Sequence, residues 1–245
     1  MKPLCDIINI YCLTKTFYVM KKVENLLLEC GAVKFNAQHP FTYKSGMLSP
    51  IYCDAKSIAG FPLVYPQIIK SYQEGIYKLW KEAGEPMYLT IAAVDGAVFW
   101  TTLAASTILK DEKFKKEMYK GHDNVSGLPI SWVLPAPKDH GLFKQIDGAK
   151  IGPDNAVIIV ENVIKTGKTA LDAVQAVRLA GGKVLGIVAL MSYDLPKVKE
   201  ALKKIPVVTL TTYDKLVAAA VENDYLSKSQ VDVVKAWHKD PYNWK

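Results

Sequence analysis

The chain has 245 residues, half of them hydrophobic, and a formal net charge of +7. This length suits one large α/β domain with a full core and room for a small subdomain. The basic residues are almost all lysines spread along the chain, and Arg178 is the single arginine. We therefore expect phosphorylated small molecules as ligands rather than nucleic acid.

Cysteine usage and the first residues argue against a secreted or membrane-bound protein. The four cysteines lack the Cys-x-x-Cys spacing and the nearby histidines of a zinc site, so we expect reduced thiols in a cytoplasmic protein. Residues 1–19 contain apolar pieces, but Asp6, Asn9 and Lys15 interrupt them and no small-residue cleavage site follows. We interpret this segment as an N-terminal extension, neither a signal peptide nor a membrane span.

The first half of the body alternates helix and strand patterns. Segment 32–55 mixes aromatic and turn residues as in a short β-hood over a pocket. The apolar spacing of Pro62–Glu82 predicts a long helix. Tyr88–Ala93 then predicts a buried strand, and the turn Val94–Gly96 leads into another helix.

The middle of the chain is less regular. Segment 110–127 is rich in lysine and ends in turn formers, which is typical of a solvated insertion. Leu128–Leu134 predicts a strand, and it leads into a loop at about 135–150.

A strand–loop–helix–strand unit dominates the second half. Ala156–Val160 is an apolar run typical of a strand buried on both faces, and the helix after Thr169 ends at Gly181–Gly182. Lys183–Leu190 predicts the next parallel strand. A further strand and two closing helices are expected at Ile205–Leu210, Tyr213–Asn223 and Ser227–Trp237.

The loop inside this unit predicts a phosphate site. It lies at the carboxyl edge of the sheet, where unpaired N–H groups and the helix dipole favour an anion. Gly167 permits close approach of the backbone, Thr166 and Thr169 offer hydroxyls, and Lys165 and Lys168 add charge. Glu161, at the end of the strand, could accept hydrogen bonds from sugar hydroxyls. Together these residues predict a site for ribose 5-phosphate.

Two other interpretations of this loop compete. Thr-Gly-Lys-Thr sequences also occur as plain helix caps. A nucleotide P-loop ends in Gly-Lys-Thr as well, but it requires a glycine where this chain has Asn162. The spacing therefore excludes the P-loop.

Three segments, in order, resemble the type I phosphoribosyltransferases, and among them the orotate phosphoribosyltransferases. Glu161–Thr169 resembles the phosphoribosyl-binding signature, Phe41–Tyr52 the orotate-binding segment, and Lys138–Gly141 the mobile catalytic loop. The resemblance runs from about 23 to about 215, and Met20–Gly31 is similar to the first helix of these enzymes, which ends at glycine. It implies a mostly parallel, Rossmann-like α/β sheet flanked by helices, in one domain over 20–245 with the hood, the charged insertion and the mobile loop described above.

The resemblance also implies a role for each matching residue. Glu161 and Asn162 would hold the ribose hydroxyls. The loop after them would hold the 5-phosphate through Lys165, Thr166, Gly167, Lys168 and Thr169. Lys138 and His140 would act on the leaving diphosphate as catalytic residues. The base or diphosphate would be bound by Lys44, Tyr52, Asp95 and Tyr193.

The chain departs from the family at several positions, where the family has an aromatic residue, a cation or a second acid. The substituted positions are Val94, Asp95, Leu134, Pro135, Asn162 and Tyr193. Tyr193 stands where the family offers an arginine to the orotate carboxylate, and a phenol cannot form a bidentate ion pair. Asp95 would repel a diphosphate unless Mg²⁺ lay between them.

Three functions therefore stay open. The first is an orotate phosphoribosyltransferase-like enzyme of pyrimidine biosynthesis, which would use phosphoribosyl diphosphate with Mg²⁺ and form a homodimer. The second is a non-catalytic nucleotide-binding or regulatory module. The third is a transferase for another base.

Overall fold

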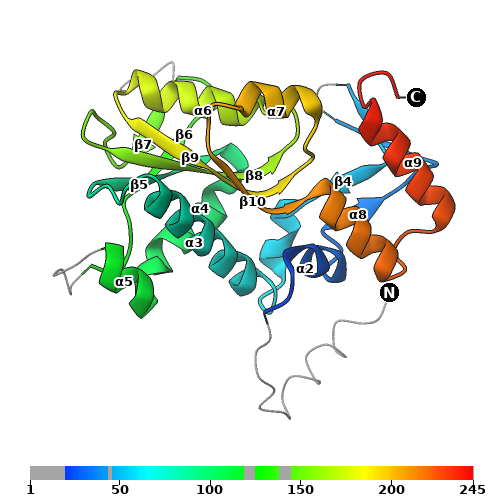
Figure 1. The fold of residues 1–245 in the computed structure, drawn as a ribbon, viewed down its shortest axis with the longest axis horizontal. Coiled ribbons are helices and arrows are strands. Elements are labelled where there is room, and N and C mark those ends of the chain that lie inside the picture. Colours follow the sequence, from blue (N-terminus) through cyan, green and yellow to red (C-terminus); the bar gives the residue numbers. More distant parts are fainter. Residues whose placement is uncertain (1–19, 44–45, 119–124, 138–144, 245) are drawn as a thin grey trace, which may run out of the picture.

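A six-stranded sheet forms the centre of the computed structural model, which describes residues 20–43, 46–118, 125–137 and 145–244 (Figure 1). The strand order is β10-β9-β8-β5-β6-β7, with all neighbours parallel except β6 and β7. The strands are β5 Leu89–Val94, β6 Ile130–Val133, β7 Ile146–Gly148, β8 Ala156–Ile164, β9 Lys183–Ser192 and β10 Val207–Thr212. This confirms the predicted mostly parallel α/β sheet.

Helices cover both faces of this sheet. Figure 1 shows α6 and α7 on one side, and α3 and α4 on the other. Their bounds are α3 Tyr65–Glu82, α4 Val98–Thr107, α6 Lys168–Leu179 and α7 Pro196–Leu202. None of the helices in the described ranges is long and apolar enough to cross a membrane.

The central strand β8 is longer than predicted. Its first five residues are buried, as expected for a strand covered on both faces. The helix α6 ends at Leu179, and the left-handed Gly181, with φ 93°, follows it. The strand continues to Ile164, so Glu161 and Asn162 are strand residues, and the loop before α6 shrinks to 165–167. The prediction placed Glu161 at the end of the strand, and the structure extends the strand three residues beyond it.

The sheet changes direction between β5 and β8. From β5 the chain moves outward to β6 and β7, and it then returns to place β8 on the other side of β5, with Ala93 paired to Val160. A crevice at the carboxyl ends of two such strands is the usual ligand site of open α/β sheets. The loops after β5 and β8 both meet there.

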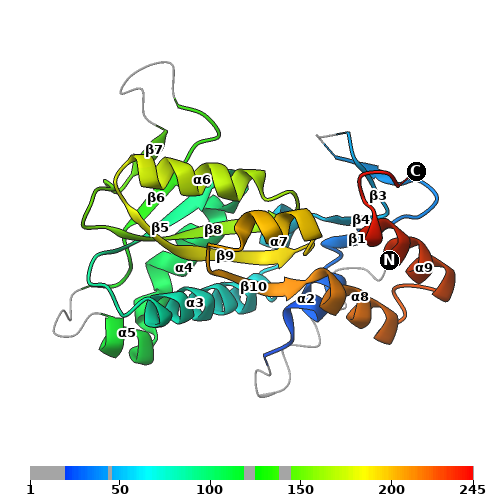
Figure 2. The ribbon, with the colours of Figure 1, turned by 45° about the horizontal axis from the view of Figure 1, so that its top comes forward.

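The predicted hood is present as two small antiparallel pairs. β1 Val33–Phe35 pairs with β4 Ile51–Cys53, and β2 Phe41–Thr42 pairs with β3 Leu48–Ser49. Figure 2 shows these strands at the end of the molecule that also carries α8 and α9. The indole Nε1 of Trp237 donates to the Leu48 carbonyl at 2.8 Å and so ties α9 to the hood.

The helices around the hood follow the predicted pattern. The first helix is shorter than the predicted segment that ends at Gly31. The two closing helices begin within one residue of their predicted starts. The three are α2 Val23–Glu29, α8 Tyr213–Glu222 and α9 Lys228–Lys239.

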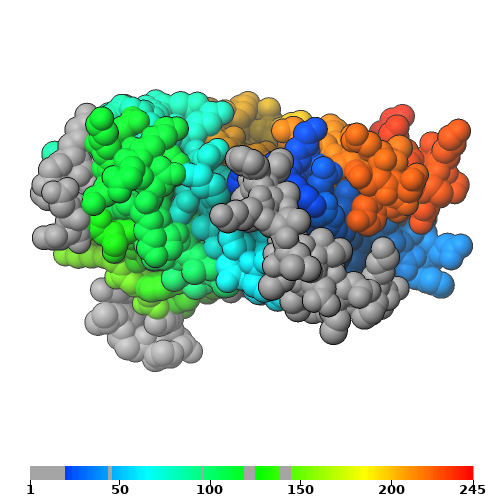
Figure 3. All heavy atoms as spheres, turned by 90° about the horizontal axis from the view of Figure 1, so that it is seen from below, coloured from blue at the N-terminus to red at the C-terminus, as the bar shows by residue number. Residues whose placement is uncertain are grey.

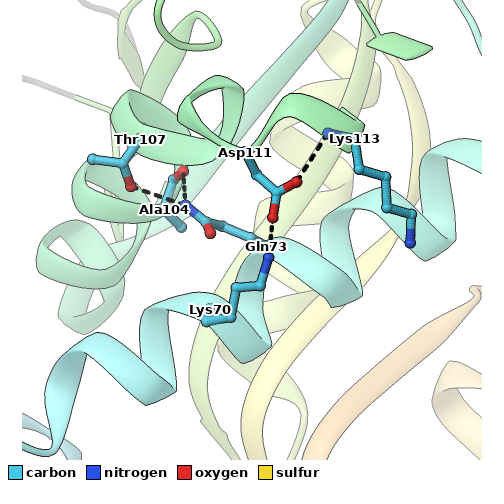
Figure 4. A network of polar contacts seen from close by, with 6 residues as sticks. All are labelled: Lys70, Gln73, Ala104, Thr107, Asp111 and Lys113. Atoms are coloured by element: carbon cyan, nitrogen blue, oxygen red, sulfur yellow. Dashed lines mark hydrogen bonds and ion pairs between the residues drawn. The ribbon is translucent and has the colours of Figure 1, made fainter. Parts of the chain in front are cut away.

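The segment predicted as a solvated insertion contains a packed helix, α5 Glu112–Met118. Phe114 is only 1% exposed, and Lys70 of α3 pairs with Asp111 just before α5 (Figure 4). In the same network Gln73 donates to the Ala104 carbonyl at 3.2 Å. Burial of one aromatic ring thus holds a charged segment against the body.

This helix lies far from the hood. In the space-filling view from below, the green segment that includes α4 and α5 forms one end of the face, and the orange and red residues of α8 and α9 form the other (Figure 3). We therefore exclude α5 from the site.

Two short elements escaped prediction, α7 and β7. β7 lies inside the predicted loop 135–150 and pairs antiparallel with β6, from Ser131 with Gly148 to Val133 with Ile146. The Leu134 N–H donates to the Gln145 carbonyl at 2.8 Å and closes the base of a shorter loop. Lys138 and His140 lie outside the described residues, as do Lys44 and the extension 1–19.

Candidate functional site

The junction of β8 and α6 has the backbone geometry that an anion site requires. Gly167 precedes α6 with φ 76° and ψ −6°, a left-handed conformation, and no described side chain caps the helix. A Cβ at this position would lie 3.0 Å from Val198 Cγ1. The position therefore requires glycine, and the first amides of α6 are left without intrahelical acceptors.

The predicted phosphate-loop residues surround this junction. Thr166, Lys168 and Thr169 are exposed, so the loop faces solvent. The Lys168 Nζ lies 2.5 Å from Asp172 Oδ2 on the next turn, and both side chains are well exposed. Such a pair contributes little to stability and can open to an incoming phosphate. The 5-phosphate role of these residues stays a prediction.

Glu161 and Asn162 join β8 to its surroundings through buried hydrogen bonds. Glu161 is 7% exposed, and its Oε1 accepts from the Asn162 N–H at 2.7 Å. Its carbonyl accepts from the Tyr72 hydroxyl at 2.8 Å. These contacts fix the end of β8 from the inside.

Asn162 also connects the two sides of the crevice. Its Nδ2 donates to the Gly96 carbonyl at 2.8 Å, in the turn Asp95–Ala97 that follows β5. Its Oδ1 is buried and has no hydrogen-bond partner in the described structure. A buried acceptor left unpaired is unfavourable, so a donor supplied by a ligand would be stabilising here.

A lysine that the sequence did not reveal lies over the same turn. A Cβ on Gly96 would lie 2.6 Å from Asn162 Nδ2 and 3.2 Å from Lys56 Cε. Lys56 belongs to the short helix Ala55–Gly60 after the hood, and it is exposed. Its only sequence signal is its position three residues after the last hood strand, which does not predict a contact with residue 96. Asp95 begins the turn after Val94, which is buried, and the Asp95 side chain lies outside the described atoms.

Lys165 departs from the rest of the loop because its side chain contacts the hood. Its Nζ lies 3.3 Å from the centroid of the Tyr43 ring, a cation–π contact. Partial burial lowers the pKa of the ammonium to about 8, because the charged form is poorly solvated.

Tyrosines next to this lysine join the hood to β9. The Tyr43 hydroxyl donates to the Ile51 carbonyl at 2.9 Å, so the Tyr193 hydroxyl, 2.8 Å away, must donate to Tyr43. Burial raises the pKa of Tyr43 and of Tyr193. Tyr193 is 1% exposed, and its hydroxyl is already engaged. Tyr52 keeps 37% exposure while its ring lies 5.8 Å from that of Tyr43 and 5.5 Å from that of Phe41. Tyr43 thus connects the two predicted base-site tyrosines, Tyr52 and Tyr193, whose role stays a prediction.

The described residues offer no preformed metal cage. Within these ranges, no group of three or more His, Cys, Asp or Glu side chains gathers closely enough to hold a metal ion. Leu134 and Pro135 bring no charge to the β6 end of the crevice, where Leu134 pairs through its backbone with Gln145.

Curated proteins resemble the chain over nearly its whole length. No protein-family model matches the chain. The orotate phosphoribosyltransferase of Listeria monocytogenes is 33% identical over 228 residues, 92% of this chain and 98% of the relative. That of Porphyromonas gingivalis is 30% identical over 226 residues, 91% of this chain and 97% of the relative.

Solved structures show the same fold. The orotate phosphoribosyltransferase of Aeropyrum pernix superimposes with a TM-score of 0.59 at 18% identity, covering 84% of this chain and 99% of that one. The UMP synthase of Leishmania donovani gives 0.65 at 20% identity, covering 89% of this chain and 41% of that one. The family predicted from the motifs is confirmed, and the chain belongs to the orotate phosphoribosyltransferases.

Proposed function

We propose that the protein transfers ribose 5-phosphate from phosphoribosyl diphosphate to orotate, forming orotidine 5′-monophosphate in pyrimidine nucleotide biosynthesis. The observation that carries this proposal is the left-handed Gly167 at the start of α6. It follows β8, and the turn at Gly96 follows β5, the neighbouring parallel strand. Relatives that match over nearly their whole length are named for this activity.

The chemistry needs positioning and charge rather than a covalent nucleophile. As the base nitrogen attacks C1 of the ribose, the bond to diphosphate breaks and positive charge develops on the sugar. The amides around Gly167 would hold the 5-phosphate, while Glu161 and Asn162 would hold the ribose hydroxyls. By resemblance, Lys138 and His140 would neutralise the leaving diphosphate from a loop that closes over the site and excludes water.

Mg²⁺ is the proposed cofactor, and the residues fit an ion that arrives with the substrate. Glu161 offers a carboxylate, and Asn162 offers an amide oxygen without a partner in the described structure, both of them oxygen ligands of the kind that Mg²⁺ takes. Since these are only two residues, oxygens of the diphosphate and the sugar would supply most of the ligands of Mg²⁺. When bound, the ion would offset the charge of the diphosphate. We further propose a homodimer, because the family's mobile loop reaches a neighbouring subunit, and a cytoplasmic location.

Two alternatives keep specific support. Val94 and Leu134 bring no charge to the diphosphate side, which favours a module that binds a nucleotide without turnover. The Tyr193 hydroxyl is occupied by Tyr43, which favours a transferase for another base.

The test is an assay with orotate, phosphoribosyl diphosphate and Mg²⁺ that follows the loss of orotate absorbance. We expect turnover that needs all three and that falls sharply in Glu161→Gln. Glu222→Gln removes an exposed carboxylate at the end of α8 and should retain the rate. Absence of turnover at high enzyme concentration, together with calorimetric binding of orotidine 5′-monophosphate, would replace the enzyme by the binding module.

A further inference from the structure

Lys165 carries a partly buried charge that no carboxylate of the described residues balances. Among the described residues, no carboxylate forms an ion pair with its Nζ, and its contact is the uncharged ring of Tyr43. Loss of solvent around an unpaired ammonium is unfavourable, and a cation–π contact offsets only part of that cost. The lowered pKa has desolvation as its cause, with no opposing carboxylate. This position therefore favours an anionic ligand.

Lys165 is the first residue of the predicted phosphate loop, but its side chain points away from the amides of that loop. The amides that suit a phosphate lie at Gly167 and the start of α6. The Lys165 ammonium instead lies over the ring of Tyr43, the residue that follows the hood strand Phe41–Thr42. The sequence alone grouped Lys165 with the 5-phosphate ligands, whereas its contacts are with the hood.

The surroundings of this ammonium suit a flat ring. Phe41, Tyr43 and Tyr52 form a row of aromatic contacts, and Tyr52 keeps an exposed face. Aromatic faces stack on planar ligands, while a desolvated ammonium takes a carboxylate. Tyr193 is neutral, and its hydroxyl is committed to Tyr43, so Lys165 is the cation of this group among the residues that the structure describes.

We infer that Lys165 binds the carboxylate of the base substrate and so selects a pyrimidine that carries a carboxylate over the same pyrimidine without one. This inference rests on the proposed function and deepens it. Lys165 would be a specificity residue at the base rather than a ligand of the 5-phosphate.

The test compares orotate with uracil, which lacks the carboxylate, in wild type and Lys165→Gln. We expect kcat/KM for orotate to fall roughly 10- to 150-fold, the loss of one charged hydrogen bond of about 1.5–3 kcal/mol. The KM for phosphoribosyl diphosphate should change less than about threefold, because the variant removes a contact to the base and leaves the contacts to phosphoribosyl diphosphate in place. The rate with uracil should not fall. Lys183→Gln removes an exposed lysine at the amino end of β9 and should preserve the preference for orotate.

Calorimetry gives a second measurement that does not need turnover. At pH 9 the free ammonium is largely neutral, since its pKa is about 8, and a bound carboxylate would raise that pKa. Orotate binding should then take up a proton at pH 9 and none at pH 7, and Lys165→Gln should abolish the uptake. Tyr43, the titratable group in contact with Lys165, has a raised pKa and stays neutral at both pH values.

The outcomes separate the inference from the proposed function. If Lys165→Gln mainly raised the KM for phosphoribosyl diphosphate, or lowered kcat/KM for orotate and uracil equally, the carboxylate role of Lys165 would be overturned. The proposed transferase activity would still stand. A wild type that turns over neither base removes the proposed function. In that case, equal binding of orotate and uracil, or orotate binding unchanged in Lys165→Gln, overturns the inference as well.

Discussion

The two central strands of the sheet, β8 and β5, end side by side but present different chemistry to a ligand. At the β8 end, the donors are main-chain amides placed by Gly167, and side-chain substitutions leave such donors in place. At the β5 end, Val94 and Asp95 stand where the family carries an aromatic residue and a lysine. Backbone recognition is retained with the fold, whereas side-chain charge can be lost by a single substitution.

The structure also shows which contacts fix the β5 end, the side where Val94 and Asp95 replace the family's residues. Asn162 of β8 donates to Gly96 in the β5 turn, and Lys56 approaches the same glycine from the hood side. An exposed lysine beside this turn brings positive charge to a place where the turn itself has an acid. The proposed sugar-phosphate side thus depends on main-chain amides, whereas the proposed diphosphate side would take its positive charge from other elements, such as Lys56.

The largest expected effect comes from disturbing the main-chain amides at the β8 end. Gly167→Ala should lower kcat/KM for phosphoribosyl diphosphate by at least about 100-fold, because charged hydrogen bonds to phosphate contribute about 1.5–3 kcal/mol each and more than one would be lost. An alanine in the left-handed region adds a cost of about 1–2 kcal/mol. Steady-state kinetics with varied phosphoribosyl diphosphate measures the effect.

A second glycine provides the matched control for backbone strain. Gly84 has φ 84°, and a Cβ there would meet nothing within 4 Å. Gly84→Ala should therefore lose similar stability in urea unfolding while retaining catalytic efficiency. If both variants lost activity equally, strain rather than the amide cradle would explain the result.

A gain of activity should come from restoring a positive charge at the β5 end. Asp95→Lys replaces a repulsive charge by an attractive one, so we expect kcat/KM for phosphoribosyl diphosphate to rise about 10- to 100-fold from one charged hydrogen bond. Asp232→Lys makes the same charge change at an exposed position of α9 and should have little effect. An unchanged rate in Asp95→Lys would mean that other cations, Lys56 among them, already satisfy the diphosphate.

Local patterns predicted the β8 side well because its structure depends on neighbouring residues. An apolar run gives a buried strand, and glycines at 167 and 181 mark positions of positive φ. What the sequence could not show depends on distant contacts. Polar residues continue β8 because Tyr72 and Gly96 satisfy them, and Lys165 turns toward the hood because Tyr43 lies there.

Short elements were missed for a different reason. α7 has seven residues and β7 has three, too few to display a period. The charged segment before residue 119 packs through the single ring of Phe114, a signal too small to outweigh its lysines.

The smallest effect tests the link between the two sides. Asn162→Asp restores the acid that the family carries, but it replaces the donor to the Gly96 carbonyl, now at 2.8 Å, by a carboxylate oxygen. We expect the free energy of unfolding to fall by about 1–3 kcal/mol at neutral pH, since a buried acceptor would face another acceptor. Urea unfolding monitored at several pH values measures it.

The pH dependence identifies the cause. A carboxyl that faces a carbonyl has a folded-state pKa above its unfolded value of about 3.9, so its protonated form can donate to Gly96 again. The variant should therefore recover stability as pH falls through the raised folded pKa, and lose it as pH rises. Asn36→Asp is the matched control, because Asn36 only accepts, from the His39 N–H at 2.8 Å, and a carboxylate keeps that bond. If Asn162→Asp were as stable as wild type at neutral pH, Asn162 would not be the link that holds the β5 turn to β8.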